Sequence, residues 1–225
     1  LGMSQWMRGD LGGAYGSLSR ATALDPKHRK AQVQLGKLLL VGGETARAME
    51  KAELVLAEDP VNEDALLLKG AVFVVGKENG KAVSHIEGMI AKGATGAEPY
   101  LLLARAHLQE KDPRGAENAL LRGVAGNDNS VQLHRALADL YRESGEVDAS
   151  VAQVRRVIAL EPGNFGNRIA LAGIYWDAKQ PEKAREVLGA LLAERPADED
   201  ARLNVARFYV SRRAFADAES TLKAG

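Results

Sequence analysis

The sequence contains no cysteine, few aromatic residues (5%) and no long apolar run. Without cysteine, the chain can form neither disulfides nor a cysteine-based metal or redox centre. Apolar runs such as Leu38–Val41 and Ala71–Val75 are far shorter than the roughly 18 residues that a membrane-spanning helix needs. We therefore expect no direct membrane insertion within this chain.

Charge of one sign is also lacking, because 30 basic and 30 acidic residues are well mixed and the formal net charge is zero. A protein that reads nucleic acid usually has a concentrated basic face, so we expect no nucleic-acid partner. The four histidines form no H-E-x-x-H pattern, and no glycine-rich phosphate cradle is present. The sequence thus predicts no catalytic residue, no metal, no cofactor and no enzymatic activity.

Prolines recur at intervals of 34 residues along the chain. They are Pro26, Pro60, Pro162 and Pro196, while Ala94 and Asp128 occupy the two intermediate positions. A fixed period of this length is typical of a repeat array. Such an array of short helical units forms a binding surface far more often than an active site.

Other positions follow the same period, when each unit is numbered from its first residue. Position 8 is always small: Gly2, Gly36, Gly70, Ala104, Ala138, Ala172, Ala206. Position 20 is small as well: Ala14, Ala48, Ala82, Ala116, Ser150, Ala184, Ala218. Position 11 is large in most units: Leu39, Phe73, His107, Tyr141, Tyr175, Tyr209. Small residues at two fixed points allow two helices to approach closely, with the large residue beside their contact.

This pattern resembles that of the tetratricopeptide repeat (TPR) family. The unit that begins at Val131 shows it most fully, with Leu137, Ala138, Tyr141 and Pro162 at the family's positions. The resemblance covers almost the whole chain, with departures at Ala94, Gly123 and Asp128. It implies an all-α fold, a right-handed superhelical solenoid of antiparallel helix pairs.

The period also predicts the domain organisation, a single array over residues 1–225. A partial repeat covers residues 1–28, complete repeats begin at residues 29, 63, 97, 131 and 165, and a truncated repeat covers residues 199–225. Leu1 falls at position 7 of a unit and Gly225 at position 27. Neither end has the polar capping helix that a solenoid needs to cover its terminal apolar face. We therefore expect the chain to be a fragment of a longer array.

The resemblance also implies a binding site. In the TPR family, positions 2, 5, 9, 12 and 13 of each first helix line a concave groove that holds a peptide or a helix of a partner protein. In the unit that begins at Phe165, these positions carry Gly166, Ile169, Gly173, Trp176 and Asp177. The residues that we predict to line the groove are Val33, Lys37, Leu67, Ala71, Val74, Val75, Arg105, Arg135, Asp139, Arg142 and Trp176.

One binding mode of the family is not expected. The TPR proteins that bind chaperone tails use a lysine at position 5 and an asparagine at position 9. Here these positions carry Val33 and Lys37, and no later unit restores the pair.

The function predicted from these features is a non-catalytic scaffold or adaptor for protein partners. Two alternatives stay open: a scaffold that assembles with copies of itself, and the non-catalytic arm of a TPR-bearing glycosyltransferase. The composition, rich in Ala, Gly and Arg, resembles that of TPR proteins in bacterial envelope systems, including exopolysaccharide export. That resemblance favours the bacterial periplasm or envelope over the cytoplasm.

Overall fold

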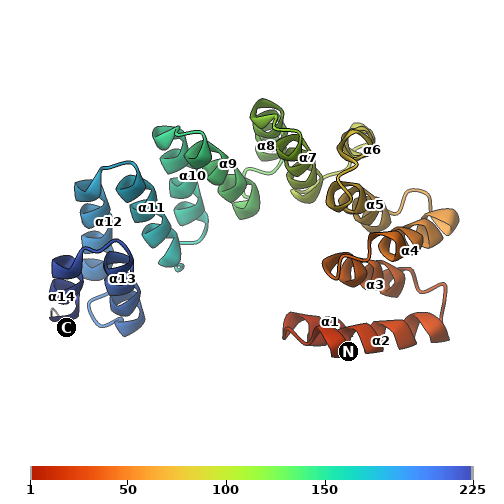
Figure 1. The fold of residues 1–225 in the computed structure, drawn as a ribbon, viewed down its shortest axis with the longest axis horizontal. Helices are drawn as coiled ribbons and strands as arrows, with labels where there is room; N and C mark the ends of the chain where they lie inside the picture. Colours follow the sequence, from red (N-terminus) through yellow and green to blue (C-terminus); the bar gives the residue numbers. More distant parts are fainter. Residues whose placement is uncertain (1, 224–225) are drawn as a thin grey trace. The chain divides into compact units, whose positions relative to one another are not determined.

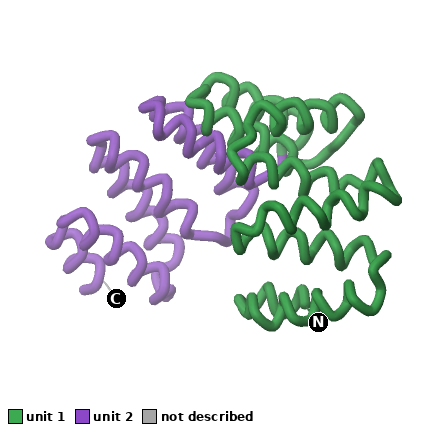
Figure 2. The backbone as a smooth tube through the Cα atoms, turned by 45° about the vertical axis from the view of Figure 1, so that its right-hand side comes forward, with its two compact units in different colours: residues 1–128 green, residues 129–225 purple. Residues whose placement is uncertain are grey.

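The structure, a computed structural model, describes residues 2–223, and every regular element in that range is an α-helix. The all-helical prediction is therefore confirmed. The helices form two compact units, the first ending at Asp128 and the second beginning at Asn129 (Figure 2). That the units act as one continuous array stays a prediction. Among the helices of residues 2–223, none combines the length and apolar character needed to cross a bilayer.

Consecutive helices form pairs within each unit (Figure 1). Unit 1 contains α1 (Gly2–Met7), α2 (Leu11–Leu24), α3 (Arg29–Val41), α4 (Thr45–Glu58), α5 (Glu63–Val75), α6 (Asn79–Ala91), α7 (Glu98–Gln109) and α8 (Pro113–Gly126). Unit 2 contains α9 (Val131–Glu143), α10 (Val147–Leu160), α11 (Gly166–Asp177), α12 (Pro181–Glu194), α13 (Glu199–Ser211) and α14 (Phe215–Lys223). Inside each unit every helix packs on the next, and α5 also contacts α3 and α7, the first helices of the neighbouring pairs.

One turn geometry joins the two helices of every pair. The residue at position 15 adopts a left-handed conformation with φ between 58° and 79°; it is Gly9, Gly43, Lys77, Lys111, Gly145, Lys179 or Arg213. The next backbone N–H then donates to the carbonyl five residues back, as from Glu44 to Leu39 and from Gln180 to Tyr175, both at 2.9 Å. This arrangement satisfies a carbonyl that would otherwise be unpaired at the end of the first helix.

Side-chain caps fix where many of the helices begin. The side chains of Asp10, Asn62, Asp112, Ser130 and Asp198 each accept a hydrogen bond from the backbone N–H three residues later. Such a bond satisfies one of the backbone donors that a helix N-terminus leaves without a partner.

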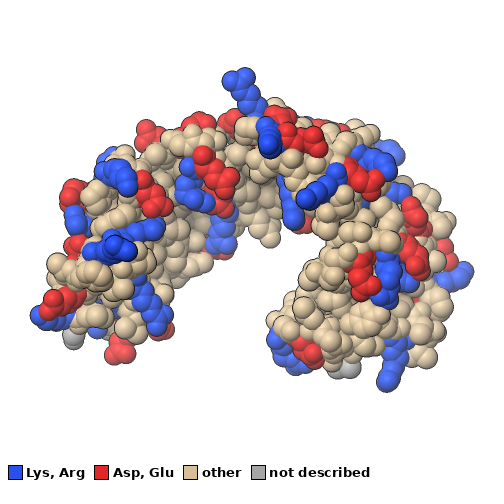
Figure 3. All heavy atoms as spheres, in the orientation of Figure 1, with Lys and Arg blue, Asp and Glu red and all other residues tan. Residues whose placement is uncertain are grey.

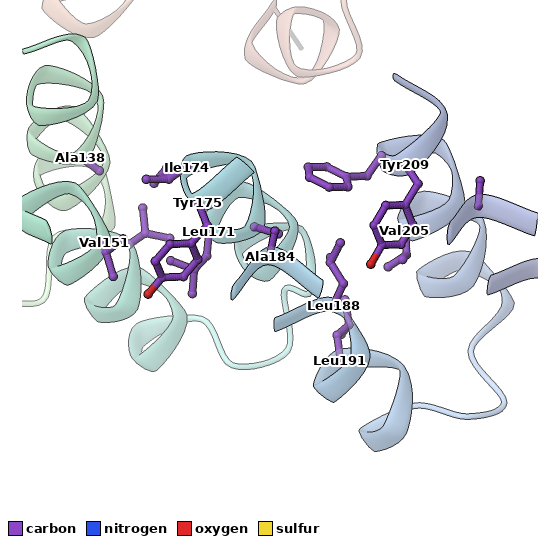
Figure 4. Close-up of a cluster of buried hydrophobic side chains, with 14 residues drawn as sticks. Ala138, Val151, Leu171, Ile174, Tyr175, Ala184, Leu188, Leu191, Val205 and Tyr209 are labelled. Carbon is purple, nitrogen blue, oxygen red and sulfur yellow. The ribbon is translucent and has the colours of Figure 1, made fainter. Parts of the chain in front are cut away.

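The small residues at position 8 permit close packing, as the sequence pattern predicts. A Cβ added to Gly36 would lie 2.4 Å from Leu68 Cδ2, so no larger residue fits there without displacing its neighbour. In unit 2, Ala172 and Ala184 are completely buried and let α11 and α12 approach each other. These residues belong to a cluster of 14 buried side chains that forms the core of unit 2 (Figure 4).

Candidate functional site: a cleft in unit 2

A cleft of about 560 Å³ lies within unit 2, and most of its lining comes from the first helix of each helix pair. Three of the predicted groove residues, Arg135, Asp139 and Arg142, line it together. The other lining residues are Ala138, Val154, Val157, Gly166, Asn167, Ile169, Ala170, Gly173, Ile174, Asp177, Phe208 and Arg212. The cleft is thus built from α9, α10, α11 and α13, together with Arg212, which directly follows α13.

The floor of the cleft is apolar and continuous with the core of unit 2. Ala138 of α9 and Ile174 of α11 point toward each other across the space between the two helices (Figure 4). Val157 of α10 and Phe208 of α13 complete this floor, and all four side chains are buried. Most of their surface is used in folding, so only their exposed edges face the cleft.

A polar network stands at the end of the cleft where α11 begins. One nitrogen of the Arg135 guanidinium donates to Glu161 Oε2 at 2.6 Å and to Asn167 Oδ1 at 3.1 Å. Asn167 donates in turn to Glu161 Oε2 at 3.1 Å. Asn167 is 7% exposed and occupies position 3, which is Ala31, Ala65, Pro99, Leu133 and Ala201 in the other units. A buried polar group needs hydrogen-bond partners, and this network supplies them while it holds Arg135 in place.

The network also acts on the acidity of Glu161. The hydrogen bond from Asn167 is the main cause that keeps the pKa of Glu161 below its ordinary value, with Asn164 and the charge of Arg135 adding to it. A carboxyl whose pKa is lowered in the folded state stabilises that state above its unfolded pKa, about 4.3 for glutamate. This contribution is lost as the pH falls through the lower, folded pKa.

We therefore expect Glu161→Gln to reduce the acid sensitivity of the protein. Between about pH 6 and about pH 3, the melting temperature of the wild type should fall further than that of the variant, because only the wild type loses this carboxylate. Circular dichroism melts at a series of pH values provide the measurement. Glu186→Gln, at an exposed site on α12, is the matched control and should follow the wild type. Parallel curves for Glu161→Gln and wild type would contradict the role given to this carboxylate.

Two ion pairs stand at the opposite end of the cleft. Arg142 Nη2 lies 3.3 Å from Asp139 Oδ1 on α9, and Arg212 Nη2 lies 3.2 Å from Asp177 Oδ1. The Arg212 guanidinium is also 5.4 Å from the centroid of the Phe208 ring. Together with Arg135, these four charged residues form the rim of the cleft. The rim therefore carries both signs of charge, in keeping with the mixture of acidic and basic side chains on the face shown in Figure 3.

Trp176 lies outside this cleft. Its ring makes edge-on contacts with Phe208 and Tyr209, at centroid distances of 5.8 Å and 6.1 Å. The Arg185 guanidinium lies 5.6 Å from the Trp176 ring. These contacts hold the half-buried indole against α13, so the first role that the structure gives Trp176 is packing. Ligand contact by Trp176 stays a prediction.

The structure corrects two of the predicted groove residues in unit 1. Val33 is 2% exposed and Val74 is 0% exposed, because both side chains pack into the core between helices. A side chain without accessible surface cannot contact a ligand, so including Val33 and Val74 in the groove was wrong.

The other predicted residues of unit 1 keep accessible surface. Leu67, Ala71 and Val75 are half-buried along α5, and Arg105 on α7 is exposed. Lys37 is half-buried and its Nζ lies 3.3 Å from Asp64 Oδ1. A role of these five residues in binding stays a prediction.

Sequence reasoning missed several residues of the cleft in unit 2. Asn167, Ile174, Phe208 and Arg212 fall outside the five groove positions, and Ala138 was assigned only to helix packing. Only Asn167 left a signal in the sequence, as a polar residue at a position that is apolar in every other unit. Phe208 lies on α13 and Arg212 directly follows this helix, and no spacing rule links them to α9.

The sequence and the fold were compared with those of known proteins. Two models of the tetratricopeptide repeat match the sequence, one over residues 1–63 and 101–165 and the other over residues 141–199 and 176–225. The two matches of the first model alone cover more than half of the chain. No curated protein matches the sequence.

Several solved structures share the fold. TTC0263, a thermophilic TPR protein of Thermus thermophilus, has a TM-score of 0.68 at 19% identity, with 78% of this chain and 95% of that chain covered. PilW, a type IV pilus biogenesis factor, has a TM-score of 0.66 at 16% identity, with 91% and 94% covered. YrrB, a TPR protein with an unusual peptide-binding site, has a TM-score of 0.52 at 20% identity, with 84% and 97% covered. At these identities the likeness concerns the fold alone.

Proposed function

Because the chain belongs to the tetratricopeptide repeat family, whose fold is generally a protein-interaction module, we propose that it is a scaffold that binds a peptide segment of a partner protein in the cleft of unit 2. The observation that carries this proposal is the composition of the cleft, an apolar floor beneath a rim of three arginines and two aspartates. Ligand sites of proteins typically combine a largely apolar lining with a few polar groups that orient the ligand.

The dimensions of the cleft suit a short peptide. The wall formed by α11 runs from Gly166 to Asp177, which corresponds to about 16 Å at 1.5 Å per helical residue. An extended peptide covers this length with about five residues, at roughly 3.3 Å each. A volume of about 560 Å³ holds the side chains of a few such residues and leaves the rest of the partner outside.

The proposal has support from one structural neighbour, since YrrB is a TPR protein with a peptide-binding site. The likeness to YrrB concerns the fold, so the cleft itself carries the argument. The rim adds specificity, because Arg135 and Arg142 can exchange their present carboxylate partners for those of a ligand.

We expect Ala170→Trp to abolish most of the peptide binding. Ala170 is exposed on α11 and lines the cleft, so an indole at this position occupies the space that the ligand needs. Peptides are first selected on the wild-type chain from a phage-displayed random library, and their dissociation constants are then measured by fluorescence anisotropy. The variant should weaken binding at least ten-fold, which is about 1.4 kcal/mol.

The matched control is Ala190→Trp, the same change at an exposed site of α12, which does not line the cleft. This variant should bind the selected peptides as the wild type does. Circular dichroism establishes that both variants are as helical as the wild type. If no selected peptide distinguishes Ala170→Trp from Ala190→Trp, the cleft is not the binding site and the proposed function is contradicted.

We also propose that the partner belongs to a bacterial envelope or export assembly. The support is the composition of the chain, rich in Ala, Gly and Arg, which resembles that of long TPR proteins in such systems. Crosslinking in the source cell, with a photoreactive residue in place of Ala170, identifies the protein that occupies the cleft. An envelope protein is the expected product, and a crosslink to a cytoplasmic complex alone would contradict this part of the proposal.

A further inference from the structure

We propose that the cleft selects a peptide segment with an aromatic residue, seated beside Gly173, and an acidic residue about three positions away. This inference rests on the proposed function, since it names the chemistry of the segment that the cleft binds. It follows from three features: the bare backbone at Gly173, the groups that surround it, and the distance from it to Arg135.

Gly173 lines the cleft with bare backbone. It occupies position 9, where the other units carry Lys37, Ala71, Arg105, Asp139 and Arg207. A Cβ at Gly173 would lie in ordinary contact with Arg212 Nη2 at 3.8 Å and with Phe208 Cε2 at 3.9 Å. The glycine is helical, so its backbone conformation does not require glycine. Its effect is therefore to remove a side chain from the cleft wall, so that a ring of the ligand can lie against the bare backbone of α11 beside Phe208 and Arg212.

The groups around this part of the cleft suit an aromatic ring. Ile169 and Ile174 contribute apolar surface from α11, and Phe208 contributes its ring from α13. An aromatic side chain gains edge-to-face contact with Phe208 in addition to apolar burial. The Arg212 guanidinium, held by Asp177 at 3.2 Å and placed 5.4 Å from the Phe208 ring, can also interact with the face of an incoming ring. An aliphatic side chain gains only the burial.

The charges that line the cleft favour an acidic residue in the same segment. The lining contains three arginines and two aspartates, and the two aspartates pair with Arg142 and Arg212. The acidic partner of Arg135, Glu161, is not part of the lining. A carboxylate of the ligand therefore complements the end of the cleft at Arg135.

The distance between the two subsites sets the spacing in the peptide. Arg135 contacts Asn167, which places its guanidinium at the level of position 3 on α11. Gly173 follows six residues later, or about 9 Å along the helix axis. An extended peptide covers about 9 Å with three residues. The expected ligand thus carries its acidic and aromatic residues about three positions apart.

The test uses the peptides that were selected from the random library on the wild-type chain. Their sequences should share an aromatic residue and an acidic residue about three positions apart. Gly173→Leu places a bulky side chain where the ring of the ligand would lie, and we expect it to weaken binding of these peptides at least ten-fold. Gly173→Ala, which adds a single methyl group, should weaken binding less than Gly173→Leu.

Gly189→Leu is the matched control, since Gly189 is an exposed helical glycine on α12 with open space around it. It should leave the affinity unchanged. All three glycine variants replace a poor helix former, so we expect none of them to lose helicity, and circular dichroism checks this.

Double-mutant cycles, which combine a protein variant with a peptide variant, identify which residues of the two contact each other. Replacing the aromatic residue of the peptide with alanine should weaken binding to the wild type at least ten-fold but cause little further loss in Gly173→Leu. Replacing the acidic residue with its amide should weaken binding to the wild type and have little effect on Arg135→Gln. These non-additive pairs are the result expected if the aromatic residue lies at Gly173 and the acidic residue at Arg135.

The inference and the proposed function fail in different ways. Selected peptides that lose binding in Ala170→Trp but lack the aromatic residue, or tolerate Gly173→Leu, would overturn the inference and leave peptide binding in the cleft standing. Additive effects of Gly173→Leu and the alanine peptide would also overturn it. Peptides that are insensitive to Ala170→Trp would contradict the proposed function itself.

Discussion

Val74→Asp should lower the free energy of unfolding of unit 1 by about 4 kcal/mol or more, the largest effect that we expect from a single substitution. The Val74 side chain is 0% exposed in α5, so the new carboxylate would lie in the apolar core without a partner. Folding would then require either that the charge is desolvated or that α5 separates from its neighbours. Urea unfolding followed by circular dichroism measures the loss.

The control for Val74→Asp is the same change at Val61, which is 80% exposed. We expect Val61→Asp to change the free energy of unfolding by less than about 0.5 kcal/mol. Hydrogen exchange adds a spatial readout, because the Val74 variant should lose protection in α5 and in its packing partners α4 and α6. A Val74→Asp protein as stable as wild type would show that this side chain lines an accessible groove, as the sequence alone suggested.

Leu188→Ala should lower the free energy of unfolding of unit 2 by about 2–5 kcal/mol. Leu188 on α12 is 0% exposed and belongs to the cluster of 14 buried residues that forms the core of unit 2. The substitution removes apolar contacts and leaves a cavity among side chains that α11 and α13 hold in place. Urea unfolding gives the magnitude.

Leu203→Ala is the control for Leu188→Ala, because Leu203 lies in the same unit and is 44% exposed. Its cost should stay below about 1 kcal/mol, since a large part of the Leu203 side chain already contacts water and its removal leaves no closed cavity. Equal losses for the two leucines would contradict the packing of α12 described above. Because the floor of the cleft belongs to the same core, Leu188→Ala should also weaken binding of the selected peptides.

The repeat positions explain why the fold could be predicted. Small residues at positions 8 and 20 must recur wherever two helices approach closely, so the period is visible in the order of the amino acids. Gly36 shows the reason, because a Cβ at that residue would lie 2.4 Å from Leu68 Cδ2. The turns were only partly visible. Gly9, Gly43 and Gly145 signal a left-handed residue, whereas Lys77, Lys111, Lys179 and Arg213 adopt the same conformation without any such signal.

The groove residues show the limit of reasoning from repeat positions. Position 12 carries Val74, which is completely buried, and Leu108, which is 43% exposed. The burial of a residue depends on the side chains of the neighbouring helices, and these differ from unit to unit. A position number therefore predicts which face of the helix a residue shares, but not whether a ligand can reach it.

The sequence by itself determined that this protein is an all-helical array of TPR units, because close helix packing imposes small residues at a fixed period. It also determined that Arg135, Asp139 and Arg142 share one face of α9. Only the tertiary structure decided that these residues border a cleft with Ile174, Phe208 and Arg212. The physical reason is that a cleft is the space left among side chains of several helices, and contacts between helices that are distant in sequence determine that space.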